Sequence, residues 1–142
     1  MVEQTERRPV VIVDDDPLDC QLLADAFAEV NPSQPIEKFA DAEECLRYTR
    51  ELESGDRPYP LLFLLDFGLP RKSGLELLGA LKAMQTTQPI PAVMITSNSD
   101  PSAIRACYES GANSYILKPD DWSRLLDLAK QLSLYWVVHN RL

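Results

Sequence analysis

Residues 61–70 read LLFLLDFGLP, in which a run of apolar residues leads into a single aspartate, Asp66, and then into a turn. An apolar run without polar alternation is typical of a parallel strand that is covered on both faces. Similar runs, each ending in polar residues, occur in VIVDDD at 11–16 and in VMITS at 93–97. With two weaker runs included, the sequence predicts strands at 10–13, 36–39, 61–65, 92–95 and 115–117.

Segments whose apolar residues recur at helical spacing separate these strands. Residues of the N-cap type precede most of these segments, and Glu44 stands in capping-box position relative to Asp41. The predicted helices are Leu18 to Phe27 before Asn31-Pro32, Ala42 to Leu52 after Asp41, Leu75 to Lys82 after Ser73 or Gly74, the segment between Asp100 and Gly111 with Pro101 in its first turn, and 121–139 after Asp120 or Asp121.

This alternation of strands and helices predicts an α/β fold. We expect a flavodoxin-like (βα)5 doubly wound parallel sheet with strand order 2-1-3-4-5. The chain has 142 residues and no internal repeat or change of composition, so we expect a single domain over 1–142, with residues 1–8 flexible. Functional groups of such folds lie at the carboxyl ends of the strands.

Charge and composition exclude several classes of function. Fourteen Lys+Arg against 22 Asp+Glu give a net charge of −8, and a surface this acidic repels nucleic-acid phosphates and anionic lipid. No apolar run is long enough to cross a membrane, and Asp14 interrupts the first run before it could form a signal-peptide core, so we expect a cytoplasmic protein. The odd number and wide spacing of Cys20, Cys45 and Cys107 favour reduced thiols over disulfides or a zinc site.

The predicted strands end in residues whose side chains can bind a ligand or take part in a reaction. These are Asp14-Asp15-Asp16, Asp66, Thr96-Ser97 and Lys118-Pro119, and the predicted strand order makes the four strand ends neighbours. Each residue alone would more often belong to a turn, a cap or a solvated strand end, but their joint placement indicates a site. Crowded carboxylates need a compensating cation, and oxygen ligands of this kind suit Mg²⁺. A metal, a lysine and a hydroxyl around one carboxylate form a receptacle for a phosphoryl group, with the carboxylate as nucleophile.

The motifs VIVDDD, LLFLLDFGLP, VMITS and GANSYILKP together resemble those of response-regulator receiver domains, from Val10 to about Trp136. The resemblance implies a regulator that accepts a phosphoryl group from a histidine kinase on its own aspartate, and not a turnover enzyme. It implies Asp66 as phosphoacceptor and Lys118 as the partner of the phosphoryl oxygens. It implies Asp14 and Asp15 as the acidic pair around Mg²⁺, with the Gly68 backbone carbonyl as a further metal ligand. Thr96 is implied as the switch hydroxyl and Tyr115 as the switch aromatic. It also places a cis peptide at Lys118-Pro119.

A narrower resemblance is carried by ITSNSDPSAIRACYESGANSYILKPDDW at 95–122 and LSLYW at 132–136. These segments are similar to stand-alone regulators paired with phytochrome-type histidine kinases, which implies a red-light-sensing kinase as partner. Gly68 stands where this subfamily commonly has Asn, so no side chain at that position contacts the attacking water. Asp16 adds a third acid that is a candidate for tuning metal affinity.

The last predicted helix carries more apolar residues than one face needs. Its expected core stripe is Trp122, Leu125, Ala129, Leu132 and Trp136, and the surplus residues are Leu128, Leu134, Tyr135, Val137 and Val138. A second apolar side should be buried somewhere, which predicts a homodimer formed by this helix or by the helix after Asp100 with strand 115–117 and the last helix. The alternative is that the segment folds back on its own domain. His139, the only histidine, is expected to be an ordinary surface residue.

Two other functions are weighed against this reading. A haloacid-dehalogenase-type phosphohydrolase with Asp14 as nucleophile would fit Asp14-x-Asp16, but the chain is short for that family and its isolated acid follows the third strand. A flavodoxin-like FMN binder would need a phosphate-binding loop after the first strand, where carboxylates stand instead. Phosphorylation of Asp14 or of Asp66 distinguishes the hydrolase from the receiver.

Overall fold

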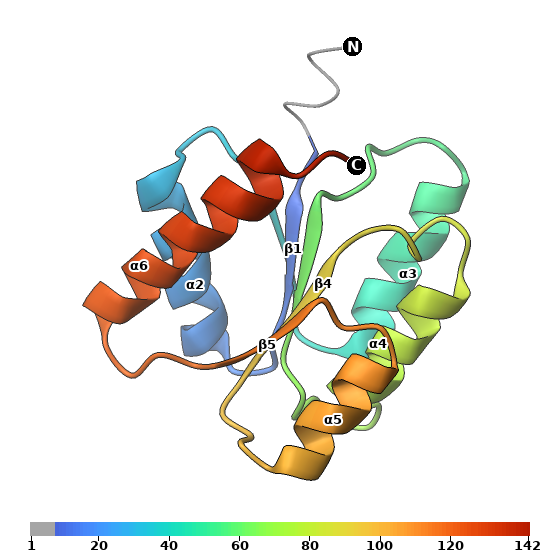
Figure 1. Cartoon of the computed structure of the whole chain (residues 1–142). Coiled ribbons are helices and arrows are strands. Elements are labelled where there is room, and N and C mark those ends of the chain that lie inside the picture. The colour runs from blue at the N-terminus through green and yellow to red at the C-terminus, as the bar shows by residue number, and fades with distance from the viewer. Residues whose placement is uncertain (1–7) are drawn as a thin grey trace.

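The computed structural model of the chain describes residues 8–142, so the flexibility expected for residues 1–7 lies outside the described range. Its five-stranded sheet is parallel, with the order β2-β1-β3-β4-β5 (Figure 1). The strands are β1 (Val10–Val13), β2 (Ile36–Phe39), β3 (Leu62–Leu65), β4 (Ala92–Thr96) and β5 (Ser114–Leu117). The predicted fold class and strand order are therefore confirmed.

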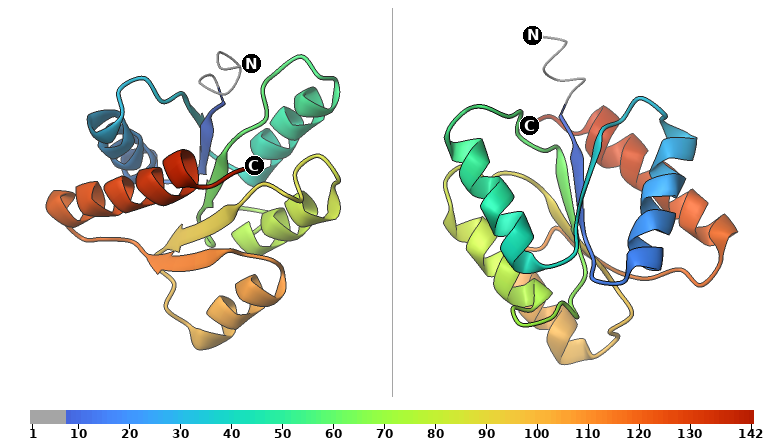
Figure 2. Two further views of the ribbon diagram at one scale, coloured as in Figure 1. Left: turned by 45° about the horizontal axis from the view of Figure 1, so that its top comes forward. Right: turned by 180° about the vertical axis from the view of Figure 1, so that it is seen from behind.

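Helices cover both faces of the sheet. They are α2 (Pro17–Val30), α3 (Ala42–Glu53), α4 (Gly74–Ala83), α5 (Pro101–Glu109), α6 (Trp122–Leu132) and a π-helical continuation, η1 (Ser133–His139). Figures 1 and 2 show α2 and α6 on one face and α3, α4 and α5 on the other. This two-sided cover explains why the central strands have no polar alternation.

Alternate side chains of each central strand enter two different cores. Val10 and Ile12 of β1 pack in the core that contains Phe27 of α2, whereas Val11 and Val13 pack in the core that contains the leucines of α4. The strands pair in register, so that Val13 lies opposite Leu65 at the carboxyl ends of β1 and β3. The residues that follow these two positions are consequently brought side by side.

Side-chain caps begin the helices as the sequence predicts. Asp41 accepts a hydrogen bond from the Glu44 N–H at 2.9 Å, but the Glu44 carboxylate accepts from the Ala40 N–H and not from Asp41, so the expected capping box is only half formed. A reciprocal capping box occurs instead between Ser73 and Glu76 at the start of α4. These caps satisfy backbone N–H groups that have no partner within the helix.

The last helix departs from the predicted stripe. Ala129 and Leu132 are buried as expected, but Trp122 is 43% exposed. Trp122 is the first residue of α6, and a helical side chain covers the turn preceding its own position, where no helix exists in this case. Leu128 and Val137, predicted as surplus, pack against the core. The π-helical winding of η1 contributes to this difference, because i→i+5 hydrogen bonds change which residues share a face.

Arg8, the first described residue, is held by hydrogen bonds to a distant segment of the chain. The Arg8 guanidinium donates to the carbonyls of Tyr59 and Pro60 at 2.9 and 3.2 Å, which ties the start of the described chain to the segment before β3. Each cysteine is buried as a free thiol, and His139 is exposed, as predicted. Among residues 8–142, no helix combines the length and the apolarity needed to cross a membrane.

Candidate functional site

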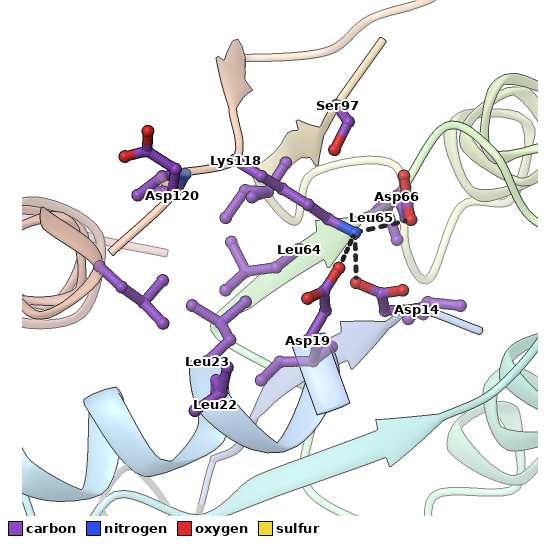
Figure 3. Close-up of a pocket in the computed structure, with 15 residues that line it drawn as sticks. Asp14, Asp19, Leu22, Leu23, Leu64, Leu65, Asp66, Ser97, Lys118 and Asp120 are labelled. Carbon is purple, nitrogen blue, oxygen red and sulfur yellow. Dashed lines mark hydrogen bonds and ion pairs between the residues drawn. The ribbon is translucent and has the colours of Figure 1, made fainter. Parts of the chain in front are cut away.

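Three carboxylates surround one ammonium group at the carboxyl edge of the sheet. Lys118 Nζ lies 2.9 Å from Asp14 Oδ2, which follows β1, and 3.1 Å from Asp66 Oδ2, which follows β3. The third carboxylate belongs to Asp19 in the first turn of α2, with its Oδ2 2.8 Å from the same nitrogen. Figure 3 shows these side chains converging on Lys118, whereas Asp120 lies apart from them. The structure thus brings Asp14, Asp66 and Lys118 together.

Oxygen atoms suitable for a metal ion lie at the same edge. Asp14, Asp15 and Asp66 each offer one carboxylate oxygen, and these atoms lie within 4.8 Å of one another. Asp14 and Asp66 are buried, while Asp15 is exposed. The Gly68 N–H donates to Asp66 Oδ1 at 3.3 Å, which places the turn after β3 against this group. Carboxylate oxygens without nitrogen or sulfur ligands suit a hard divalent cation.

The two buried carboxylates differ in their ionisation. Burial alone would raise the pKa of Asp66, but hydrogen bonds from the Thr96 hydroxyl, Lys118 and the Gly68 N–H together hold this pKa below its usual value. For Asp14, burial dominates over the hydrogen bonds from the Asp16 N–H and Lys118, and raises the pKa to about 6. Asp66 is therefore the more readily ionised of the two.

The cation at the centre of the site keeps its charge. Burial by itself would lower the pKa of Lys118, but its contacts with Asp19, Asp14 and Asp66 raise it above the usual value. The backbone N–H of Lys118 also donates to the Thr96 carbonyl at 2.9 Å, which fixes the end of β5 against β4. Since the described residues contain no cis peptide bond, the cis peptide expected at Lys118-Pro119 is wrong for this structure; trans is the lower-energy isomer of an X–Pro bond.

Comparison with known proteins identifies the class to which this site belongs. The sequence profile of the response regulator receiver domain matches residues 10–130. The chain belongs to the response regulator receiver domain family. Receiver domains bind a divalent metal, are phosphorylated on an aspartate and receive the phosphoryl group from histidine kinases.

Individual relatives resemble this receiver domain over nearly their whole length. The probable methanogenesis regulatory protein FilR2 of Methanothrix harundinacea is 30% identical over 93% of this chain and 85% of its own. The crystal structure of the phosphorylated cyanobacterial phytochrome response regulator RcpA has a TM-score of 0.86 and 27% identity over 95% of this chain and 97% of that one. The Mn²⁺-bound response regulator Rcp1, known from Synechocystis, has a TM-score of 0.83 and 24% identity over 95% and 98%.

Thr96 and Tyr115 meet at the loop after β4 of this receiver domain. The buried Thr96 hydroxyl accepts a hydrogen bond from the Asn98 N–H at 3.4 Å. The Tyr115 hydroxyl donates to the Asn98 carbonyl at 2.7 Å, and the Tyr115 N–H donates to the Tyr108 hydroxyl. The two predicted switch residues therefore contact the backbone of the same residue, Asn98, in this loop.

The structure shows a capping role for one acid of this receiver domain and places at the site a second acid that the sequence did not indicate. Asp16, predicted as a strand-end or helix-cap residue and as a candidate for tuning the metal, caps α2 by accepting from the N–H groups of Leu18 and Asp19. Asp19 was not predicted at the site, although its carboxylate contacts Lys118. An acid in the first turn of a helix is ordinarily explained by the helix dipole, so its position in the sequence gave no distinguishing signal.

Close packing holds the loop after β3 of this receiver domain in place, and a cavity lies near it. The Gly74 N–H donates to the Phe67 carbonyl at 2.8 Å, and a Cβ at Gly74 would overlap the backbone of Asp66. On the other side of Lys118, a cavity of about 240 Å³ is lined by leucines of α2 and α6 as well as by the acids of the site. The site is thus closely packed on the α4 side and adjoins a cavity on the α2 side.

Proposed function

We propose that this receiver domain accepts a phosphoryl group from a sensor histidine kinase on Asp66. The observation that carries the proposal is that Asp66 is held in its ionised form by Lys118, Thr96 and the Gly68 N–H at the end of β3. A phosphohydrolase with Asp14 as nucleophile is less well supported, because Asp16, the second acid of the Asp14-x-Asp16 pair, is engaged as a helix cap.

In the proposed step, an Asp66 carboxylate oxygen forms a bond to phosphorus. The bond from phosphorus to the imidazole nitrogen of the donor breaks, and its electron pair stays on that nitrogen. The Lys118 ammonium and the Thr96 hydroxyl lie beside the Asp66 carboxylate. They are therefore suited to donate hydrogen bonds to the oxygens of a phosphoryl group bound there. The protein itself is the phosphorylated product, so no catalytic turnover is proposed beyond slow loss of the phosphoryl group.

We assign Mg²⁺ to the carboxylates of Asp14, Asp15 and Asp66, with the Gly68 backbone carbonyl as a further ligand. The grouping of three carboxylate oxygens supports this assignment, and Rcp1 is described in an Mn²⁺-bound form. When bound, Mg²⁺ supplies positive charge that offsets the carboxylates and the phosphoryl oxygens. The exposure of Asp15 leaves room for the water ligands that Mg²⁺ usually keeps.

The proposed response to phosphorylation passes through Thr96 and Tyr115. The Thr96 hydroxyl accepts a long hydrogen bond from the Asn98 N–H and lies beside Asp66, where a phosphoryl oxygen would give its proton a charged acceptor. Movement of Thr96 toward this acceptor would shift the loop that Tyr115 contacts through the Asn98 carbonyl. The surface formed by α5 and β5 would change with it.

The partner that we propose is a phytochrome-type histidine kinase, supported by the similarity to RcpA, which is a phytochrome response regulator. We also propose a homodimer, because two groups of exposed apolar side chains have no cover within the described chain. One group lies on α5, β5 and the start of α6 (Tyr108, Leu117, Trp122) and the other on η1 (Leu134, Tyr135, Val138). The buried free thiols are compatible with a cytoplasmic location, where thiols stay reduced.

Phosphoryl transfer is tested with acetyl phosphate and Mg²⁺, followed by intact-mass measurement and mapping of the modified residue. We expect stoichiometric modification of the natural protein at Asp66 and none in Asp66→Asn. Asp25→Asn, which changes an exposed acid of α2, serves as the matched control and should be modified normally. Modification of Asp14, or full modification of Asp66→Asn, contradicts the proposal.

The dimer is tested by sedimentation velocity with and without the phosphoryl mimic beryllofluoride. Leu117→Glu and Leu134→Glu each place a charge in one of the two apolar groups, and Leu18→Glu changes an exposed leucine outside both. We expect one of the first two variants to be monomeric and Leu18→Glu to behave like the natural protein. A natural protein that stays monomeric under both conditions excludes the dimer.

A further inference from the structure

Asp19 contacts the Lys118 ammonium but belongs neither to the carboxylates that could bind a metal ion nor to the cap of α2. Its Oδ2 atom lies 2.8 Å from Lys118 Nζ, the shortest of the three carboxylate contacts of that nitrogen. Asp19 is outside the group of oxygens that could hold a metal ion. The cap of α2 is supplied by Asp16, which accepts a hydrogen bond from the Asp19 N–H. Neither metal binding nor helix capping therefore accounts for the position of the Asp19 carboxylate.

The ammonium group has a limited number of hydrogen bonds to give. Lys118 has three N–H donors, and three carboxylates already lie within 3.1 Å of Nζ. A phosphoryl oxygen can take a full hydrogen bond from Lys118 only where one of these contacts weakens. Asp14 and Asp66 also face the proposed metal, whereas Asp19 faces only Lys118 within this cluster. The Asp19 side chain is 40% exposed, so water can solvate it once the ammonium group moves away.

We propose that Asp19 is a positioning residue that holds the Lys118 ammonium on the α2 side of the site and competes for it with incoming phosphoryl oxygens. The proposal rests on the proposed function, in which Asp66 is the phosphoacceptor. Asp19 thereby slows phosphoryl acceptance and links the first turn of α2 to the end of β5. Phosphorylation transfers one Lys118 contact from Asp19 to the phosphoryl group and so releases this link.

The test compares rates of phosphorylation by acetyl phosphate at saturating Mg²⁺ over a range of donor concentrations. At low donor concentration we expect Asp19→Asn to react about three- to tenfold faster, the size of effect that one screened charge exerts over a few ångströms. The gain should shrink at saturating donor, and Asp19→Glu should restore the slow rate. Asp25→Asn removes the same charge from an exposed position of the same helix, and should leave the rate unchanged.

The route through Lys118 is tested by repeating the comparison in the Lys118→Ala background. If Asp19 acts through Lys118, Asp19→Asn should have no effect there on phosphorylation, or on the affinity for beryllofluoride where phosphorylation is too slow to follow. The proposal is overturned by an unchanged or slower rate in Asp19→Asn, or by an equal acceleration without Lys118. Phosphorylation that persists in Asp66→Asn overturns the proposed function instead, so the two failures are distinguishable.

Discussion

The ends of β1 and β3 present two carboxylates in nearly matching positions. Asp14 and Asp66 follow residues that are paired in register, both are buried, and both contact Lys118 within 3.1 Å. Their pKa values nevertheless move in opposite directions: that of Asp14 is raised to about 6, and that of Asp66 is lowered. Burial and a shared cation thus do not decide which acid carries the proton.

The difference lies in the remaining hydrogen-bond donors. The Thr96 hydroxyl and the Gly68 N–H also lower the pKa of Asp66, whereas the pKa of Asp14 is lowered by the Asp16 N–H and Lys118. Each donor to a carboxylate favours its charged form, while burial favours its neutral form. These donors therefore favour the ionised form of Asp66 at the end of β3 more strongly than that of Asp14 at the end of β1.

The largest expected effect comes from removing the cation that both acids share. Lys118→Ala leaves the carboxylates of the site without their common partner, and we expect the free energy of unfolding to fall by about 3 kcal/mol at pH 8. The loss should be smaller at pH 5, because Asp14 is then protonated and contributes no charge. Urea unfolding in the presence of a chelator measures both values.

The exposed Lys130 provides the matched control for this change. Lys130→Ala should alter the free energy of unfolding by less than about 0.5 kcal/mol at either pH. An equal loss at pH 5 and pH 8 in Lys118→Ala would show that the Lys118 side chain stabilises the fold through packing. In that case the charge of Asp14 would not contribute to the effect.

A somewhat smaller effect is expected when Asp14, the acid whose pKa is raised, is replaced by the neutral Asn. Folding raises the pKa of Asp14 from 3.8 to about 6, so the folded protein binds this proton more tightly than the unfolded chain. The resulting stabilisation is complete below about pH 4 and is lost as the pH rises through about 6. Without metal, we therefore expect Asp14→Asn to be more stable than the natural protein by about 2 kcal/mol at pH 8, and no more stable at pH 4.

Asp15→Asn is the control, since it neutralises the adjacent but exposed acid. Its free energy of unfolding should follow that of the natural protein at both pH values to within about 0.5 kcal/mol. If Asp14→Asn and Asp15→Asn shift stability alike, the burial of Asp14 has no special consequence.

The smallest expected effect is the competition between a proton and Mg²⁺ for Asp14. Below about pH 6, the pKa of Asp14, one proton must leave before the carboxylate can bind the metal, so the affinity for Mg²⁺ should fall about fivefold from pH 6 to pH 5. Above pH 7 it should change little. Calorimetric titrations in two buffers of different ionisation enthalpy measure both the affinity and the proton released; an affinity that is equal at pH 5 and pH 8 would exclude this competition.

Much of the fold was predictable because its signals are local. Apolar runs that end in polar residues predicted the strands, and Asp41, Ser73 and Asp100 marked helix starts that the structure confirms. The meeting of Asp14, Asp66 and Lys118 followed from the predicted strand order, because parallel neighbours end at the same edge of a sheet. Periodicity failed in part in the last helix, because Trp122 is the first residue of α6 and Val137 lies in the π-helical segment.

The amino-acid sequence by itself determined the alternating architecture and which acids, hydroxyl and lysine stand at the strand ends, since hydrophobic period and capping chemistry act over a few neighbouring residues. The strand order was expected because doubly wound sheets have few arrangements, and not from these local signals. Only the tertiary structure decided that Asp19 rather than Asp16 reaches Lys118, and that the neighbouring acids Asp14 and Asp66 have opposite pKa shifts. Both outcomes depend on distances and burial between segments far apart in the chain, where a difference of a few ångströms changes an electrostatic interaction severalfold.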